Sequence, residues 1–530
     1  MNVRTGAPRA ATTVTATRAP RLGSLVTPGA LVTLAALLMV AATLVPLGYI
    51  VSTLVSTGWD ETMRLIFRPR VGELLRNTAE LVLLTVPICV TLGIGLAWIV
   101  ERTDVPGAAW WGPIFAAPLA VPAFVNSYGW VSAVPSLHGL WAGVLVATVS
   151  YFPLVYLPVA ATLRRLDPAV EESARALGSG PFAVFARVVL PQLRLAILGG
   201  ALLISLHLLA EYGAFAMIRF DTFTTAIFEQ YQSSFAGPAG STLSGVLVLL
   251  CLLLLAGEAG VRGRARYARI GGGAQRSAHR IRLRLGKIPM FVLLAGALAA
   301  TLGVPLWTIG RWLRIGGAAV WDTGEIGASL GQTLGLAAAA AAITTLCAFP
   351  VAWIAVRSTS RFARIIEGAN YITSSLPGIV IALALVTVSI RWLPGLYQTA
   401  ATILAAYTLM FMPRALVSVR AGLAQVPVGL EEASQALGIA PAATFFRVTL
   451  RLTAPAAAAA AAMVFVAVAT ELTATLLLAP NGTRTLAMQF WQLSGELDYA
   501  AAAPYALIMI LVSVPVTYLL FTQSRKAAGL

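Results

Sequence analysis

The chain has 530 residues, of which 58% are hydrophobic and only 11% are charged, with a mean hydropathy of +0.83. Soluble chains carry about 25% charged residues, so this composition excludes an ordinary soluble protein, and apolar blocks of about 20 residues exclude a membrane β-barrel. The net charge is +16, and the cations lie in the polar segments between the apolar blocks. This placement is typical of the loops of a membrane protein and favours that class over a nucleic-acid-binding protein.

Residues 1–28 form a basic stretch ahead of the first apolar block. They are rich in Ala, Thr and Pro, and the block that follows, at 29–53, is too long for the apolar region of a typical signal peptide. We therefore expect an uncleaved first span behind a disordered cytoplasmic tail.

The apolar blocks predict an all-α polytopic membrane protein with about twelve transmembrane helices, six in each half of the chain. The first half covers 29–259, with a core from about 75, and the second covers 288–522, with a core from about 330. A basic linker at 260–287 separates the halves, and a short tail follows at 523–530. The predicted spans are 29–53, 77–100, 112–133, 140–163, 195–217, 242–259, 288–309, 330–356, 369–390, 397–419, 453–478 and 504–522.

The Arg and Lys residues predict the orientation of these spans in the lipid bilayer. An even number of spans places both termini on one side, and a start inside gives the inner segments most of the 37 cations. The linker at 260–287 alone carries nine cations and no acid. The positive-inside rule therefore predicts that both termini and the linker are cytoplasmic, beside anionic headgroups, and we expect no nucleic acid to bind.

The two halves are parallel repeats. Ala-Trp-Ile-Val at 97–100 matches Ala-Trp-Ile-Ala at 352–355, an offset of 255 residues, and after a five-residue insertion the offset becomes 260. Because six spans separate the copies, both have the same orientation, and the axis that relates them lies along the membrane normal. This arrangement predicts a pathway between the halves.

A polar stretch occurs once in each half, at equivalent positions. In the first copy, Asp167 can cap a helix that has Pro168 at its first position, and Gly178 can end it in the left-handed conformation. Each copy is predicted to fold as helix, glycine turn and helix at the membrane surface, with both of its Glu residues offering acceptors to a partner's Arg or Lys. The candidate docking residues are Glu171, Glu172, Ser173, Ala174 and Gly178, and Glu431, Glu432, Ala433, Ser434 and Gly438.

This spacing resembles the cytoplasmic EAA loop of binding-protein-dependent ABC importer permeases, although Arg451 stands where the family has Pro. The resemblance implies that each hairpin is a coupling helix that enters a cleft on a cytoplasmic ATP-binding subunit. It also implies a homodimer of that subunit, an extracytoplasmic substrate-binding protein and a location in the bacterial inner membrane. A Glu pair in a single loop would fit a solvated loop equally well, and its occurrence in both repeats favours docking.

Further segments resemble the fused, two-half permeases of the ferric-iron uptake group. They are Ala210-Glu211-Tyr212-Gly213-Ala214, the stretch 375–380 and the stretch 470–478. That group is similar to the thiamine and phosphonate permeases. The resemblance implies ferric iron as the substrate, with thiamine, phosphonate or another small solute as the alternative.

Two acids, Glu211 and Glu471, lie at matching positions in the predicted spans 195–217 and 453–478. A carboxylate within a membrane costs a few kcal/mol and normally faces a cavity or a partner. Two interpretations remain open: a polar lining or gate of the translocation path, shared with Tyr212 and Thr473, or carboxyl groups hydrogen-bonded between helices to hold the two halves together. Pro122 and Pro377 are expected to kink two other spans.

The sequence contains no G-x-x-x-x-G-K-[ST] phosphate loop, so we expect ATP hydrolysis on a separate subunit and no catalytic residue, cofactor or metal site in this chain. A gradient-driven secondary transporter is the alternative transporter class. One acid per half and a parallel repeat fit it less well than they fit an ABC importer permease. A membrane enzyme has no support, since the three histidines, His138, His207 and His279, have no nucleophile or metal ligand around them in the sequence.

Overall fold

The computed structural model describes residues 29–527 apart from 235–236, 263–279, 359 and 374. In this part of the chain the regular structure is helical, with one isolated β-bridge between Thr103 and Ile281. The predicted all-α polytopic fold is confirmed. The predicted disordered tail and most of the basic linker lie outside the described residues.

The helices of the first half run from the first span to the start of the linker. They are α1 (Ala30–Thr57), α2 (Trp59–Ile66), α3 (Pro69–Arg102), α4 (Ala108–Ala116), η1 (Ala117–Ala120), α5 (Ala123–Ala133), α6 (Gly139–Tyr151), α7 (Pro153–Arg165), α8 (Pro168–Ala176), α9 (Pro181–Val184), the π-helical η2 (Phe185–Val189), α10 (Leu190–Ala210), α11 (Gly213–Met217), α12 (Phe223–Ser234) and α13 (Gly237–Arg262).

The second half repeats this order from the end of the linker. Its helices are η3 (Arg284–Gly286), α14 (Lys287–Leu298), the π-helical η4 (Ala299–Gly303), α15 (Val304–Gly316), η5 (Gly317–Val320), α16 (Thr323–Arg357), α17 (Arg361–Thr373), α18 (Gly378–Trp392), η6 (Pro394–Leu396), α19 (Ala400–Ala424), α20 (Val428–Ala436), α21 (Pro441–Thr444), the π-helical η7 (Phe445–Thr449), α22 (Leu450–Ala469), α23 (Thr473–Leu478), α24 (Leu486–Gly495) and α25 (Tyr499–Ala527).

Ten of the described helical runs are long and apolar enough to cross a membrane, and one bent pair adds an eleventh. That pair, α4–η1 with α5, is bent by 91° and coincides with the predicted span 112–133. The predicted span 369–390 overlaps the end of α17 and most of α18, an apolar helix of 15 residues that is shorter than the others. The prediction of about twelve spans thus corresponds to ten long runs, one broken span and one short helix.

The expectation that Pro122 and Pro377 kink continuous helices is wrong, because the helix stops and restarts at each of them. Val121 has an extended backbone (φ −95°, ψ 112°), and Pro122 is the N-cap of α5. Pro377 is likewise the N-cap of α18. The helical conformation is disfavoured for a residue that precedes proline, so the helix ends at that residue.

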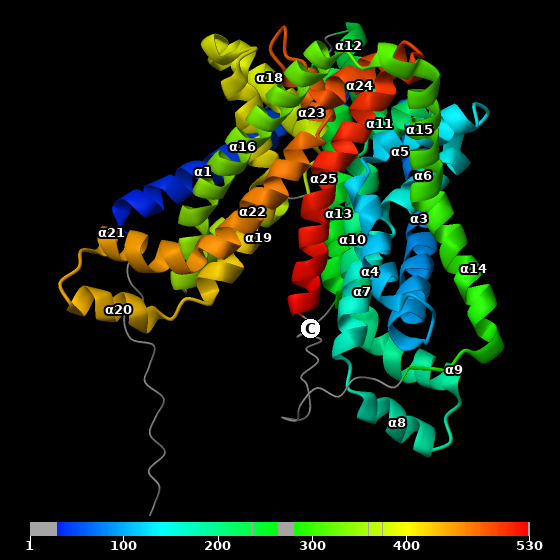
Figure 1. The fold of residues 1–530 in the computed structure, drawn as a ribbon. Coiled ribbons are helices and arrows are strands. Elements are labelled where there is room, and N and C mark those ends of the chain that lie inside the picture. The colour runs from blue at the N-terminus through cyan, green and yellow to red at the C-terminus, as the bar shows by residue number, and fades with distance from the viewer. Residues whose placement is uncertain (1–28, 235–236, 263–279, 359, 374, 528–530) are drawn as a thin grey trace, which may run out of the picture.

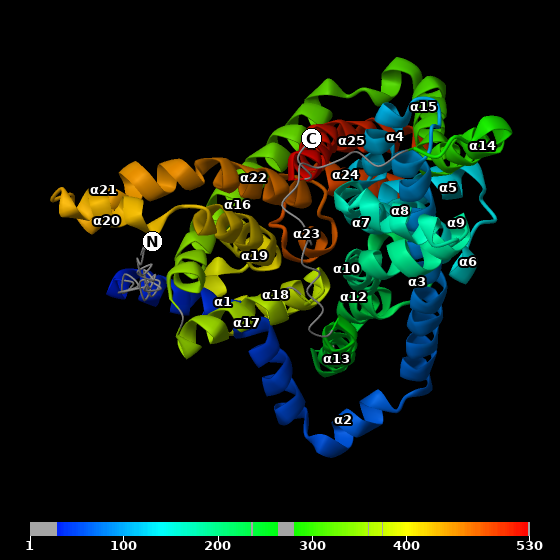
Figure 2. The same ribbon diagram turned by 90° about the horizontal axis from the view of Figure 1, so that it is seen from below.

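The first transmembrane region of each half packs on the other half. α1 contacts α16, α17 and α18 of the second half, and α15 contacts α5 of the first half. Figures 1 and 2 show α1 running beside the helices of the second half. These contacts of α1 and α15 join the two halves along their outer sides.

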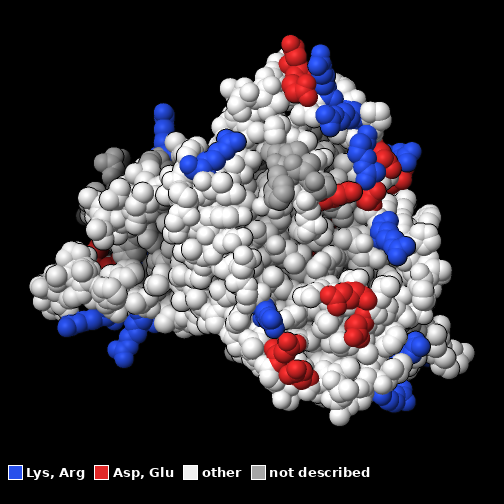
Figure 3. All heavy atoms as spheres, turned by 90° about the horizontal axis from the view of Figure 1, so that it is seen from above, with Lys and Arg blue, Asp and Glu red and all other residues white. Residues whose placement is uncertain are grey.

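The hairpins α8–α9 and α20–α21 project from one end of the molecule, which we call the hairpin face (Figure 1). The opposite end carries α12 and α24, and charged side chains of both signs are spread over it (Figure 3). Two ion pairs lie there, Arg70–Asp221 at 2.9 Å and Arg484–Glu325 at 3.1 Å. This end of the molecule therefore presents charges of both signs.

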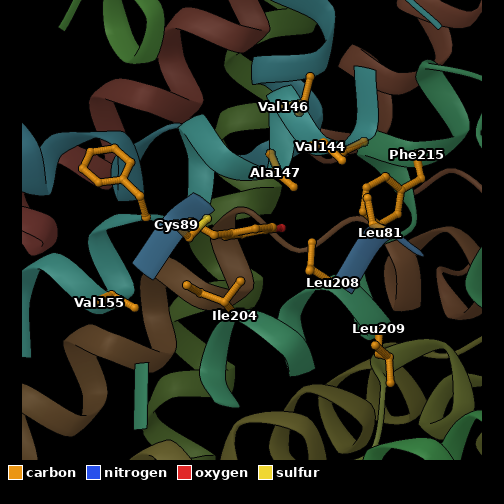
Figure 4. Close-up of a cluster of buried hydrophobic side chains, with 14 of the residues drawn as sticks. Leu81, Cys89, Val144, Val146, Ala147, Val155, Ile204, Leu208, Leu209 and Phe215 are labelled. Atoms are coloured by element: carbon orange, nitrogen blue, oxygen red, sulfur yellow. The ribbon is translucent and has the colours of Figure 1, made fainter. Parts of the chain in front are cut away.

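Equivalent helices build the core of each half: α3, α7 and α10 in the first, α16, α19 and α22 in the second. Figure 4 shows the buried side chains of Leu81, Cys89 and Ile204 among those of the first core. α10 approaches α7 at Gly200, where an added Cβ would lie 2.7 Å from Val155 Cγ2. Only glycine allows this close contact, so the core fixes how the hairpin-bearing helix α10 packs.

Candidate functional site

The two polar stretches form equivalent helical hairpins on the hairpin face. α8 begins after Asp167, whose carboxylate accepts a hydrogen bond from the Ala169 backbone N–H at 3.0 Å, and Pro168 is its first residue. α20 begins after Pro427. The helix starts are therefore set by local signals in the sequence.

Each hairpin turn depends on a glycine with left-handed backbone geometry, at Gly178 (φ 84°) and Gly438 (φ 78°). The Gly178 N–H donates to the Arg175 carbonyl at 2.9 Å, and the Ser179 N–H donates to the Ala174 carbonyl at 3.0 Å. These paired bonds close the end of α8 in a Schellman motif, and the second hairpin repeats both of them. A side chain at either glycine would strain the turn.

The two adjacent acids of each hairpin face different surroundings. Glu171 and Glu431 are buried, with 7% and 1% of their surface exposed, whereas Glu172 and Glu432 are exposed. Successive residues of a helix point about 100° apart, so one acid of each pair can be buried while its neighbour is exposed. The expectation that both acids offer acceptors to a partner is therefore wrong for Glu171 and Glu431, and it stays a prediction for Glu172 and Glu432.

Each buried carboxylate is paired with an arginine at the end of a long helix. Arg102 Nη2 lies 2.8 Å from Glu171 Oε1, and Arg357 Nη2 lies 2.7 Å from Glu431 Oε1. Arg102 and Arg357 are the last residues of α3 and α16. We call these pairs the first strut and the second strut, since each joins a hairpin to the core of its own half.

The sequence reasoning missed both struts, although the repeat contains a signal for them. Arg102 and Arg357 are separated by the same offset of 255 residues that relates the two Ala-Trp-Ile segments. Basic residues at the end of a span also fit the positive-inside pattern, so their pairing with a specific Glu could not be read from their position alone.

The second strut has more hydrogen bonds than the first. Arg357 also donates to the Val426 carbonyl at 3.1 Å, and the Thr449 hydroxyl donates to Glu431 Oε1 at 2.9 Å. Thr449 lies in the π-helical turn η7, where π turns often mark functional positions. The equivalent residue in the first half is Val189, which has no hydroxyl to donate.

The first strut lacks this support. The Arg102–Glu171 contact is close but does not have hydrogen-bond geometry. The additional partner of Glu171 is Arg175, at 3.9 Å and with 43% of its side chain exposed. Because exposed ion pairs contribute little, we conclude that the first hairpin is held more loosely than the second.

The small residues of the hairpins occupy two kinds of position. Ser173 and Ala433 are exposed, and Ala174 is half-buried. Ser434 is buried, and its Oγ lies 2.9 Å from Thr444 Oγ1 on α21. This hydroxyl pair ties the two helices of the second hairpin together.

Apolar side chains project from both hairpins into solvent. Leu177 and Phe182 are 87% and 81% exposed in the first, and Leu437 and Phe446 are 81% and 65% exposed in the second. Together with Glu172 and Glu432 they form what we call the docking surfaces. Large apolar groups exposed beside charges are typical of surfaces that bind another protein.

A cavity of about 800 Å³ lies between the two halves. Its lining comes from η1, α5, α6, α7, α10 and α11 of the first half and from α19, α22, α23 and α25 of the second. Repeat-related residues meet in it, including Glu211 with Glu471 and Leu154 with Arg414. The cavity therefore lies where the axis that relates the halves passes through the molecule.

Glu211 lies at a break in the helix and not inside a continuous span, because α10 ends at Ala210 and α11 starts at Gly213. Its Oε1 accepts from the Ala214 backbone N–H at 2.9 Å, and its Oε2 accepts from the Tyr151 hydroxyl at 2.6 Å. The carboxylate thus caps the short helix α11 while it lines the cavity.

Glu471 occupies the equivalent break before α23. Its Oε1 accepts from the Ala474 N–H at 2.9 Å, and its Oε2 accepts from the Thr475 N–H at 3.0 Å and from the Thr475 hydroxyl at 2.7 Å. Each of the two acids thus lines the cavity, and its hydrogen bonds stay within its own half. These bonds do not join the two halves, as the second interpretation expected, and the role in the path stays a prediction.

Thr473 lines the cavity, but Tyr212 does not belong to its lining. Tyr212 is buried, and its ring centroid lies 4.3 Å from that of Phe228 and 5.5 Å from that of Trp491. Its ring packs against these aromatic side chains and helps to hold the break at Glu211 in place.

Within the described residues, no group of three or more His, Cys, Asp or Glu side chains is placed to hold a metal ion.

Three relatives illustrate what the chain is similar to. It is 36% identical to the Fe(3+)-transport system permease protein FbpB 2 of Haemophilus influenzae, over 89% of this chain and 94% of that protein. It is 22% identical to the ferric transport system permease protein FbpB of Actinobacillus pleuropneumoniae, over 75% of this chain and 60% of that protein. It is 28% identical to the sulfate transport system permease protein CysT of Escherichia coli, over 40% of this chain and 84% of that protein.

A family match covers the body of both halves. Residues 81–257 and 345–526 each match the binding-protein-dependent transport system inner membrane component. The two matched segments contain the two hairpins and nearly all of the cavity lining. The resemblance of the polar stretches to permeases of this kind is thereby confirmed, and the chain belongs to the family of binding-protein-dependent transport system inner membrane components.

Proposed function

We propose that this importer permease passes ferric iron across the inner membrane to the cytoplasm. The observation that carries the proposal is the 36% identity to a protein named as an Fe(3+)-transport permease, over 94% of that protein's length. The cavity between the halves is the proposed path. Thiamine, phosphonate and other small solutes remain the alternative cargo.

We propose that an ATP-binding subunit docks on each hairpin, so that two copies of one subunit serve the two repeats. The exposed Glu172 and Glu432 can accept hydrogen bonds from its Arg or Lys side chains, and the apolar residues beside them can enter a cleft. Exposed Arg187 and Arg447 near the hairpins fit the positive-inside pattern, which supports a cytoplasmic hairpin face with both termini on that side.

The opposite face is the proposed docking site of a substrate-binding protein. It presents charges of both signs (Figure 3), including the exposed ion pairs Arg70–Asp221 and Arg484–Glu325. Such a surface suits reversible contact with a soluble protein, since charges at an interface guide association more than they add affinity.

The proposed mechanism is alternating access driven by the ATP-binding pair. Closing of that pair moves both hairpins, and each strut passes the motion to α3 or α16. The hairpin also continues through η2 directly into α10, whose far end carries Glu211 at the cavity. A displacement at the hairpin face therefore reaches the cavity through a packed helix, in each half.

The function is tested by uptake into liposomes. The chain is reconstituted with its ATP-binding subunit, and with its substrate-binding protein loaded with radioactive ferric iron. We expect iron to enter only when ATP is present on the side of the hairpins. Uptake driven by a proton or sodium gradient without ATP would support the secondary transporter in its place.

A second prediction concerns the two cavity acids. In the double variant Glu211→Gln with Glu471→Gln, each cap loses its charge-assisted hydrogen bonds, which are worth about 1.5–3 kcal/mol each. We expect coupled uptake to fall about tenfold while the protein still assembles. Glu496→Gln, at an exposed position on the opposite end, serves as the control. Normal uptake with normal coupled ATPase in the double variant would remove the gate and leave only the helix caps.

A further inference from the structure

One cation in the cavity has neither an ion-pair partner nor a hydrogen-bond partner among the described residues. Arg414 is on α19 and lines the cavity between the halves, with its side chain exposed to that space. Its guanidinium carbon lies 5.2 Å from the centroid of the Phe411 ring. Among the described residues it forms no ion pair or hydrogen bond. A charge at this depth is costly and usually has a partner or a function.

The other ionisable groups of the cavity are already engaged. Glu211 and Glu471 accept hydrogen bonds at the starts of α11 and α23. His207 Nδ1 lies 2.7 Å from the carbonyl oxygen of Leu203, one turn before it on α10. The five N–H donors of Arg414 therefore remain available to a solute in the cavity.

The repeat shows that the fold does not require an arginine at this position. The equivalent residue in the first half is Leu154, which lines the same cavity. Other cavity residues also differ between the halves; among them, His207 corresponds to Ala467, and Tyr151 corresponds to Phe411. The cation is therefore a local addition to one side of the cavity and not a consequence of the shared fold.

A free guanidinium is suited to one class of ligand. Its planar fork matches the oxygen atoms of a phosphate or carboxylate in two parallel hydrogen bonds. A fixed positive charge also repels a bare metal cation that enters the same space. An iron ion that carries an oxyanion would satisfy both conditions, since the anion faces the arginine and lowers the charge of the complex.

We propose that Arg414 forms an oxyanion-binding site in the cavity, and that the cargo crosses with an oxyanion ligand bound to it. This inference rests on the proposed function for its cargo but not for the binding site itself. The oxyanion can be supplied by an iron complex or by free anion from solution, and the test separates these sources.

Binding is measured on the full chain in nanodiscs with radioactive inorganic phosphate, and in a parallel arm with radioactive citrate. We expect Arg414→Leu, which installs the residue of the other repeat, to weaken binding of the favoured anion at least tenfold. Arg414→Lys keeps the charge without the fork, and we expect an intermediate loss. The exchange Arg414→Leu with Leu154→Arg moves the cation across the axis and should restore part of the binding.

The following results decide the proposal. Equal binding by the natural chain and Arg414→Leu, or binding of neither anion by the natural chain, would overturn it. In the uptake assay, iron and labelled anion entering together identify the complex as the source, whereas uptake of iron that is equal in Arg414→Leu and the natural chain contradicts the role in transport. If the natural chain takes up no iron but still binds phosphate through Arg414, the proposed function fails and the site remains.

Discussion

Replacing Arg357 with leucine should abolish most ATP-driven uptake while the chain still inserts into the membrane. The change leaves Glu431, which is 1% exposed, without its positive partner and with only the Thr449 hydroxyl beside it. Removing one member of a buried ion pair destabilises a structure by about 3–5 kcal/mol. We expect the second hairpin to detach from α16 to hydrate its carboxylate, so that hairpin motion no longer reaches the core.

Two measurements follow this change: iron uptake in liposomes and limited proteolysis within the hairpin. Proteolysis should become faster in Arg357→Leu and return toward normal in Arg357→Leu with Glu431→Leu, since an apolar pair can replace a buried ion pair without loss of stability. Normal uptake and normal protection in Arg357→Leu would contradict the strut.

The repeat supplies a matched control for this prediction. Arg102→Leu removes the same partner from the first strut, but Glu171 retains Arg175 at 3.9 Å and is more exposed. We expect a smaller effect there. Thr449→Val converts the second strut to the pattern of the first and should cost about 1 kcal/mol, the contribution of one hydrogen bond. A larger loss of uptake in Arg102→Leu than in Arg357→Leu would show that the additional hydrogen bonds of the second strut do not set its strength.

The second large effect is expected on the docking surfaces. The double variant Glu172→Arg with Glu432→Arg should weaken binding of the ATP-binding subunit about a hundredfold or more, since like charges facing each other at an interface cost several kcal/mol. Both residues are exposed, so the fold should be unaffected. Binding is measured by titrating the subunit onto the chain in nanodiscs, and affinity equal to that of the natural chain would reject docking through these acids.

Glu496→Arg provides the matched control for charge reversal. It makes the same chemical change at an exposed position beyond α24, at the opposite end from the hairpins. We expect it to leave binding of the ATP-binding subunit unchanged. A loss of binding in Glu496→Arg would indicate a general effect of added positive charge.

The parts of the hairpins that the sequence predicts are those set by neighbouring residues. Asp167 before Pro168 defines the start of α8, and Gly178 defines its end, because the cap, the fixed proline backbone and the left-handed turn all act within a few residues. The same reasoning holds for Gly438 in the second copy.

Local signals of this kind could not predict which of two adjacent acids is buried and which is exposed. Whether Glu431 or Glu432 is buried depends on how the hairpin rolls against its own bundle, and the arginine that decides it is 74 residues away in the chain. A tertiary contact of this kind leaves no local pattern. The repeat could have suggested it, through the shared position of Arg102 and Arg357.

The broken spans were hidden for a different reason. Hydropathy counts apolar residues over a window and does not distinguish a continuous helix from two pieces. At the start of the next helix, backbone N–H groups have no partner within that helix, and the carboxylate of Glu211 or Glu471 accepts hydrogen bonds from them. The break therefore needs no polar stretch around it. An isolated acid at matching positions of two repeats is thus a signal for a capped break as well as for a lining residue.

Site-specific cross-linking tests whether each hairpin holds one ATP-binding subunit. A photoreactive amino acid is placed at Leu177 or at Leu437, which are 87% and 81% exposed on the two docking surfaces. We expect each position alone to cross-link one subunit to the chain, and both positions together to give one chain with two subunits. Cross-linking from only one position, or from neither, would contradict it.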